Sequence, residues 1–281
     1  MTVMEPEHPS STRAELVPTP FLRWAGGKRW LVHHLEDFVP RSPRCYFEPF
    51  LGAGAAFFKA MPGRAYLSDS NRQLITTFKI VRNYADELGK VLRGLRCERS
   101  LYYRMRASQP KTPLETAVRF IYLNRCSWNG LYRVNSRGDF NVPYGGEGRN
   151  PQIWNEGSLH AAAEALSNAT LASCDFAEAL ELAGPDDFVF ADPPYTVTHG
   201  DNGFLLYNEL IFSWKDQQRL KNCLVGLHKK GGLFLLTNAD HPAIRRLYAG
   251  FPIRSVSRSS ILAADPSHRR RVTELLITNY T

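Results

Sequence analysis

The segment Asp187-Phe-Val-Phe-Ala191 narrows the possible folds of this chain more sharply than any other stretch of it. Such a short apolar run predicts a strand that is covered on both faces, as at the centre of a parallel sheet. It leads straight into Asp192-Pro-Pro-Tyr195, where proline, which has no backbone N–H, ends the strand pairing. The sequence therefore predicts an α/β protein whose central strand ends in a turn rich in hydrogen-bond acceptors.

An earlier stretch predicts the start of the same sheet. Cys45–Phe50 has the composition of a strand, Leu51–Gly54 that of a glycine turn, and Ala55–Ala60 that of a helix. Ala65–Asp69 predicts the next strand, so these residues form the first half of a βαβ unit.

The middle of the chain has a different character. Apolar residues in Leu74–Val81 and Glu115–Leu123 recur at helical spacing. In Leu131–Tyr144, two short alternating runs flank Ser136–Asp139, which predicts a β-hairpin dense in Arg, Asn and aromatic residues.

Strand patterns return near the end of the chain. Gln217–Leu227 predicts a helix, and Gly232–Thr237 and Val272–Thr278 predict strands. Strands on both sides of the middle segment indicate one sheet split by an insertion. We therefore expect a disordered leader, a split main domain and an inserted domain, at residues 1–19, at 20–75 with 165–281, and at 76–164.

The chain is basic, with a formal net charge of +8 and a pI near 9.3. This charge favours polyanionic partners, although many basic proteins bind no nucleic acid. No apolar run approaches the roughly 20 residues needed to cross a bilayer. Met1–Pro20 also lacks the apolar core of a secretory signal, so we expect no membrane association.

The five cysteines are scattered, odd in number and never in a C-x-x-C pair. This pattern argues against a disulfide framework and against a zinc site, and it fits a reducing cytoplasm. None of them follows a proline, so the Pro-Cys nucleophile of C5-cytosine methyltransferases is missing. We expect no bound metal, and buried apolar thiols instead.

Two glycine-containing motifs are candidates for a cofactor site. In Phe21–Arg29, Gly26-Gly27 allows close backbone approach beside Trp24 and Lys28, although a flexible helix entry explains the motif equally well. In Phe47–Gly54, a strand ends in a glycine turn before a helix, which directs backbone N–H groups at a ligand. Its spacing is not G-x-G-x-x-G and suits an adenosyl compound better than a pyrophosphate, with Asp69 placed to accept from ribose hydroxyls. Taken alone, the turn could simply join a strand to a helix.

Asp192-Pro-Pro-Tyr195 lies at the carboxyl end of the central strand, where open α/β sheets hold ligands. Two prolines remove two N–H donors and leave carbonyls that can only accept. The Asp192 carboxylate and the Pro193 carbonyl could thus take both hydrogens of an exocyclic amine, while Tyr195 stacks on a planar base. A Pro-Pro turn that merely ends a strand is the alternative.

The middle segment carries groups that can read bases. Arg and Asn side chains around Leu123–Arg133 and in the hairpin can hydrogen bond to guanine and adenine edges. Trp128 can wedge into a base stack, although a surface loop with one buried tryptophan would give the same pattern.

Together and in this order, these motifs resemble the Dam-type (class alpha) N6-adenine-specific DNA methyltransferases. The resemblance covers nearly all of Phe21–Tyr280 and implies a Rossmann-like, mostly parallel sheet with an inserted helical target-recognition domain that bears a β-hairpin. The further matching motifs are Leu123-Asn-Arg125, Asn129-Gly-Leu131, Arg133, Arg137–Pro143 and Thr273-Glu-Leu-Leu276.

The resemblance also implies a role for each matching residue. S-adenosyl-L-methionine would be bound by Trp24, Lys28, Glu48, Phe50, Gly52, Gly54, Asp69, Asp175, Phe176 and Asp192. The catalytic residues, which hold the target adenine, would be Asp192, Pro193, Pro194 and Tyr195. Double-stranded DNA would contact Arg23, Trp128, Asn129, Leu131, Arg133, Arg137 and Pro143.

By the same resemblance we expect a flipped adenine in a short palindromic site, with GATC as the leading candidate. We also expect a monomer in the cytoplasm of a prokaryote, or one encoded by a phage. The chain departs from the family at Arg23, where lysine is frequent, at Trp128, where tyrosine is frequent, and at Gly146-Glu147, where a basic and an aromatic residue are frequent. These departures put recognition of the outermost base pair in question.

Three other functions stay open on the residues. N4-cytosine methyltransferases use the same amine chemistry but usually have Ser in place of Asp192, and N5-glutamine methyltransferases usually have Asn there. A catalytically inactive DNA-binding module would use the basic surface alone. The intact Asp69, Asp192 and glycine turn argue against that module.

Overall fold

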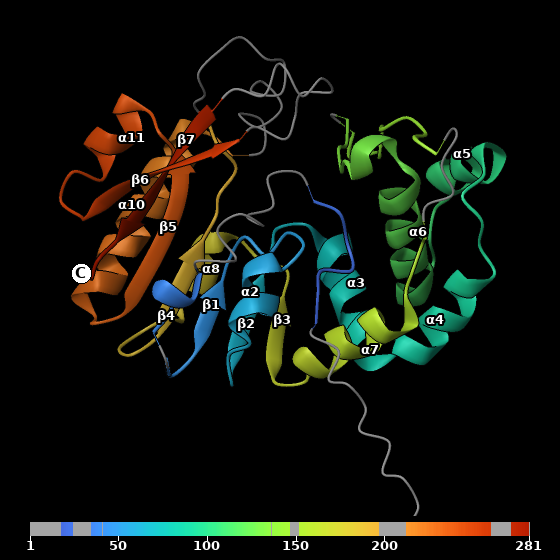
Figure 1. Ribbon diagram of the computed structural model, residues 1–281, viewed down its shortest axis with the longest axis horizontal. Helices are drawn as coiled ribbons and strands as arrows, with labels where there is room; N and C mark the ends of the chain where they lie inside the picture. The colour runs from blue at the N-terminus through green and yellow to red at the C-terminus, as the bar shows by residue number, and fades with distance from the viewer. Residues whose placement is uncertain are drawn as a thin grey trace, which may run out of the picture.

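A computed structural model describes residues 18–24, 35–40, 42–135, 137–146, 152–196, 212–259 and 271–280. Within these ranges, seven strands form one sheet in the order β3-β2-β1-β4-β5-β7-β6 (Figure 1). The strands are β1 (Tyr46–Glu48), β2 (Ala65–Ser68), β3 (Ala169–Ala172), β4 (Phe188–Ala191), β5 (Leu233–Ala239), β6 (Ile253–Ser259) and β7 (Arg271–Thr278).

The sheet is mostly parallel, as predicted. Strands β1 to β5 pair in parallel, and only β7 among these strands runs antiparallel to its neighbours, β5 and β6. The chain starts at β1, builds outward through β2 and β3, and then returns to place β4 on the other side of β1. This reversal makes the β1–β4 border a topological switch point, where open α/β sheets bind ligands beyond the carboxyl ends of their strands.

Each face of the sheet packs against its own set of helices, which explains the apolar run in β4. Phe188 and Phe190 lie in one apolar cluster, while Val189 and Ala191 lie in the other, because successive side chains of a strand point to opposite faces. The first cluster takes side chains from α2 (Ala55–Ala60) and α3 (Arg72–Asn83). The second takes them from α8 (Phe176–Glu181), α10 (Trp214–Lys229) and α11 (Pro242–Leu247).

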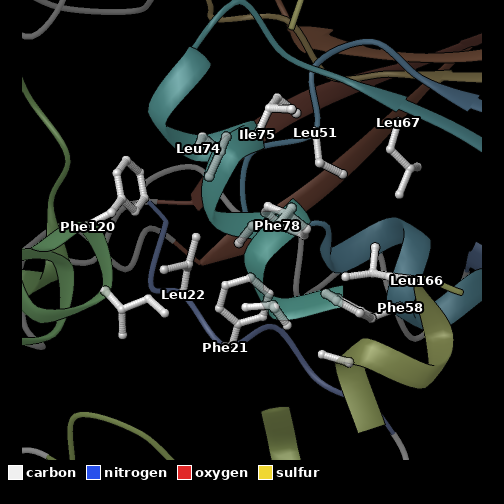
Figure 2. Packing of buried hydrophobic residues seen from close by; sticks show 14 of the residues in the cluster. Phe21, Leu22, Leu51, Phe58, Leu67, Leu74, Ile75, Phe78, Phe120 and Leu166 are labelled. Carbon is white, nitrogen blue, oxygen red and sulfur yellow. The ribbon is translucent and has the colours of Figure 1, made fainter. Parts of the chain in front are cut away.

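Helix α3 joins the sheet to the helices at the β3 end of the molecule (Figure 1). Figure 2 shows its residues Leu74, Ile75 and Phe78 among Phe21 and Phe120 of neighbouring segments. The helices at this end are α4 (Ala85–Arg93), α5 (Arg99–Ala107), α6 (Pro113–Cys126) and α7 (Glu156–Ala165). Helix α3 is continuous and runs across the expected boundary between residue 75, in the main domain, and residue 76, in the inserted domain.

The hairpin forms with less strand pairing than the sequence suggests. The Asn135 N–H donates to the Asp139 carbonyl and the Asn141 N–H to the Arg133 carbonyl, at 2.8 and 3.0 Å, around a single bridge between Val134 and Phe140. Beyond it, the Val142 carbonyl accepts from Tyr102 of α5 and the next residue is a proline without an N–H, so no ladder continues.

The cysteines are all free thiols; three are buried and two are partly buried. None of the helices in the described ranges is long and apolar enough to span a membrane. Two short 3-10 helices, η1 (Leu35–Asp37) and η2 (Trp128–Gly130), complete the described elements.

Candidate active site

Three carboxyl groups lie at the ends of adjacent parallel strands. Glu48 is the last residue of β1, Asp69 follows β2, and Asp192 follows β4. Because β2, β1 and β4 are neighbours in the sheet, the three residues gather at one edge, on the switch point. The structure thus brings together Glu48, Asp69 and Asp192, for which the resemblance implied roles at the cofactor turn, the ribose and the target base, respectively.

The glycine turn between β1 and α2 is fixed to the end of β2. The Leu51 N–H donates to the Ser68 carbonyl at 3.0 Å, and the Gly52 N–H donates to Oδ2 of Asp69 at 3.1 Å. Gly52 has a φ of +49°, and a Cβ at this position would lie 2.9 Å from the indole of Trp24. The turn therefore needs glycine both for its left-handed backbone and for the close approach of Trp24.

Glu48 is buried, with 2% of its surface exposed. The Tyr46 hydroxyl donates to its Oε2 at 2.8 Å. The pKa of Glu48 is raised to about 8, mainly by burial; the Tyr46 hydrogen bond opposes this rise and the charges of Asp192 and Asp69 add to it. Burial also raises the pKa of Asp69. These carboxyls are costly to ionise together, and a bound cation would relieve that cost.

Asp192 is held from the neighbouring strand. The hydroxyl of Thr237, in β5, donates to Oδ1 of Asp192 at 2.5 Å. Pro193 is buried, while Pro194 and Tyr195 are partly exposed. The acceptor-rich turn thus starts from an oriented carboxylate and continues to the surface.

An aromatic cluster borders the glycine turn on the α8 side. Phe50 stacks on Phe176 with ring centroids 5.4 Å apart, and Phe212 meets the Phe50 ring edge-on at 5.5 Å. Asp175 caps α8 by accepting from the Ala177 N–H at 2.9 Å. Arg219 pairs with Asp175 at 2.7 Å and lies over the Phe176 ring. The Oδ1 atom of Asp175 is therefore engaged by protein groups, whereas the Phe50–Phe176 pair has the flat apolar character that suits a purine.

Trp24 connects this site to the helical end of the molecule. Its ring stacks on Tyr132 at 5.5 Å and on Phe120 of α6 at 6.4 Å, and it also lies against Gly52. The companion residue of the first motif, Lys28, lies outside the described residues.

Most of the residues expected to contact DNA lie at or beside η2, where α6 ends on the same side of the molecule as the carboxyl ends of the strands (Figure 1), whereas Arg133 and Arg137 lie on the hairpin that follows. The Trp128 N–H donates to the Pro143 carbonyl at 3.0 Å, and a Cβ on Gly130 would lie 2.6 Å from the side chain of Arg23. Most of the set is exposed and Leu131 is partly buried; Trp128 reaches 56% exposure. The exposed members are Arg23, Trp128, Asn129, Arg133, Arg137 and Pro143.

Asn124 holds this surface in place, a role that the sequence did not reveal. Its buried amide exchanges two hydrogen bonds with the backbone of Arg23, at 2.8 and 2.6 Å, and donates to the Gly130 carbonyl at 3.2 Å. Asn124 belongs to the matching motif Leu123-Asn-Arg125, and this motif was the sequence feature that could have pointed to its role. Thr237 and Arg219 were also missed, and no motif pointed to either of them.

Comparison with known proteins decides the family. A model of the D12 class of N6 adenine-specific DNA methyltransferases matches residues 24–260. The chain belongs to this family. It is therefore an adenine-specific DNA methyltransferase by family, as the order of its motifs indicated.

Individual relatives agree along almost their whole length with this D12-class methyltransferase. The type II methyltransferase M1.LlaDCHI of Lactococcus lactis subsp. cremoris is 35% identical over 271 residues, which cover 93% of this chain and 95% of that protein. The type II methyltransferase M.MjaIII of Methanocaldococcus jannaschii is 33% identical, with 93% and 99% covered. The DNA adenine methylase of Escherichia coli K12 is 32% identical, with 91% and 93% covered.

Proposed function

We propose that this methyltransferase binds S-adenosylmethionine at the Gly52 turn and methylates N6 of an adenine held by Asp192–Tyr195. One observation carries the proposal: the glycine turn after β1 and the acceptor-rich turn after β4 lie side by side at the switch point of the sheet. A methyl donor bound at the first turn and an amine held at the second would therefore be neighbours.

The residues at the first turn fit this cofactor. S-adenosylmethionine, when bound, supplies a methyl group activated by a positively charged sulfonium. Glu48, with its raised pKa, and the nearby Asp69 and Asp192 make an environment that favours a cation. Asp69 accepts backbone N–H groups from Gly52 and Asn71, and a carboxylate has further lone pairs to accept ribose hydroxyls. Two further predicted contacts are the Trp24 ring beside Gly52 and the Phe50–Phe176 pair, which would lie beside the adenine of the cofactor.

The residues at the second turn fit an exocyclic amine. Asp192 and the Pro193 carbonyl only accept hydrogen bonds, so they would bind the two N6 hydrogens and keep the nitrogen lone pair available for the methyl group. Tyr195 would stack on the base. We propose that the amine itself is the nucleophile and that no covalent enzyme intermediate forms, because the chain has no Pro-Cys nucleophile.

We further propose that residues 76–164 recognise DNA through the surface around η2. An adenine paired inside a duplex cannot reach the end of a sheet, so the base must flip out, at a cost of a few kcal/mol. Trp128, exposed on η2, would support the stack that the base leaves. The basic net charge of +8 would contribute attraction to phosphates irrespective of sequence.

GATC remains the leading candidate site. The Nε of Arg133 donates to Asn141 at 2.8 Å, which directs the two terminal nitrogens outward. Such a fork fits O6 and N7 of guanine, and Leu131 and Pro143 would pack on a thymine methyl group.

The variant Asp192→Ala tests the proposed function. It removes an interaction used mainly in the transition state, so turnover should fall by orders of magnitude, whereas equilibrium binding of S-adenosylmethionine should weaken far less, through the loss of one nearby negative charge. Near-normal methylation by this variant would refute the proposed role of Asp192 and with it the site.

A further inference from the structure

Thr237 is a buried polar residue of β5; it follows the apolar stretch 233–236 and precedes the buried Asn238. It lies in β5 with none of its surface exposed, one residue beyond the paired residues Ala191 and Leu236. In this register its side chain lies beside Asp192, the residue that follows β4. The Thr237 hydroxyl donates to Oδ1 of Asp192 at 2.5 Å. A carboxylate has no proton to give, so the direction of this bond is fixed.

Two other buried threonines in the described residues, Thr77 and Thr278, donate to backbone carbonyls instead. Thr77, also fully buried, donates to the carbonyl of Gln73 in its own helix at 2.8 Å. Thr278 donates to the carbonyl of Tyr280 at 2.8 Å. Thr237 instead donates to a side chain of the neighbouring strand, and that side chain is the one placed at the switch point. A merely structural threonine does not need this partner.

We propose that Thr237 is a positioning residue for methyl transfer: its hydroxyl fixes one oxygen of Asp192 so that the other faces the amine of the target base. This inference rests on the proposed function. The hydrogen bond from Thr237 restrains χ1 and χ2 of Asp192, and a rotation about either bond would take the acceptor away from the amine. Thr237 is β-branched and lies in a strand, so its own hydroxyl has little rotational freedom and can act as a fixed reference. Holding an acceptor in the reactive geometry raises the rate of the step in which it takes part.

The test compares three variants under single-turnover conditions with saturating S-adenosylmethionine and DNA. Thr237→Val keeps the side-chain shape and removes the hydroxyl, Thr237→Ser keeps the hydroxyl, and Thr77→Val makes the same chemical change at the other buried site. We expect Thr237→Val to lower the methylation rate about 10- to 100-fold, the range typical of losing a hydrogen bond to a charged group. Equilibrium affinities for S-adenosylmethionine and DNA should stay within about two-fold of the wild type, because the hydroxyl contacts neither ligand. Thr237→Ser should restore most of the rate, and Thr77→Val should leave it unchanged.

Two results would overturn the inference. A wild-type rate in Thr237→Val would show that Asp192 needs no help, and equal loss in Thr237→Val and Thr237→Ser would assign the effect to packing. Thr237→Ala provides a second hydroxyl-free variant if Thr237→Val fails to fold, and a wild-type rate in it overturns the inference in the same way. Inactivity of Asp192→Ala alongside full activity of Thr237→Val would reject only the role of Thr237, whereas activity of Asp192→Ala would reject the proposed function itself.

Discussion

The surroundings of Glu48 determine its protonation state. It is buried beside Asp69 and Asp192, and the folded protein holds its pKa at about 8, above the ordinary value of 4.5. Between these two values the folded protein keeps a proton on Glu48 that the unfolded chain releases. The carboxyl is therefore neutral near pH 7 until a cation binds nearby.

This proton makes the stability of the wild type depend on pH. The free energy of unfolding should fall as pH rises from about 4.5 to about 8, by up to about 1.4 kcal/mol per pH unit, and Glu48 should contribute no further loss above that range. Glu48→Gln cannot titrate, so its stability should vary less with pH over the same range. Urea unfolding at a series of pH values measures both slopes.

Tyr46→Phe removes a hydrogen bond that stabilises the charged form of Glu48, so it should move the upper limit of this pH range to higher pH. Identical slopes in the wild type and Glu48→Gln would contradict this account.

Arg133 is predicted to contribute to discrimination between bases more than to overall affinity for DNA. Losing a bidentate contact to guanine removes about 1–3 kcal/mol of discrimination, so Arg133→Ala should relax one base position and still methylate. Arg137, exposed at the hairpin turn and paired with Asp139 at 3.4 Å, provides the contrast. Arg137→Ala should weaken binding similarly for all sequences. Methylome sequencing of both variants distinguishes these outcomes, and an unchanged site in Arg133→Ala would be evidence against its role.

At the scale of elements, the sequence predicted those helices and strands whose residue pattern is sufficient to define them. Ala55–Ala60 was predicted as a helix with the bounds that α2 has, and Ala65–Asp69 as the strand that forms β2, because a glycine turn and an apolar strand leave strong local signals. Strand β3, Ala169–Ala172, and the edge strand β6 were not predicted, since segments of mixed polarity become strands only through their neighbours. The pairing of Thr237 with Asp192 depends on the register of β4 and β5, which motifs cannot give.

The element η2 is built to present Trp128. Asn124 holds Gly130 at one end, and the Trp128 N–H binds the Pro143 carbonyl, so the exposed ring stands on a fixed turn. If this ring supports the stack left by a flipped base, 2-aminopurine at the target position should brighten when the wild type binds. Trp128→Ala should give a smaller rise with little change in binding of S-adenosylmethionine. Absence of any rise with the wild type would show that the base does not flip.

At the scale of the whole molecule, two surfaces meet at Trp24. The ring lies against Gly52 in the proposed cofactor turn and stacks on Tyr132, close to the residues expected to contact DNA. Cofactor and DNA would thus be bound on either side of one rigid aromatic contact. This arrangement depends on segments far apart in the sequence, and the motif around Trp24 alone left its purpose undecided.

We propose, above all, that the site at the β1–β4 switch point methylates adenine at N6. This proposal is tested most directly by expressing the wild type and Asp192→Ala in a host free of DNA methylation and analysing the genomic nucleosides together with the methylome. We expect N6-methyladenine within one short motif in cells expressing the wild type, and none with Asp192→Ala at equal protein level. N4-methylcytosine in place of N6-methyladenine, or N6-methyladenine formed equally well by Asp192→Ala, would contradict the account.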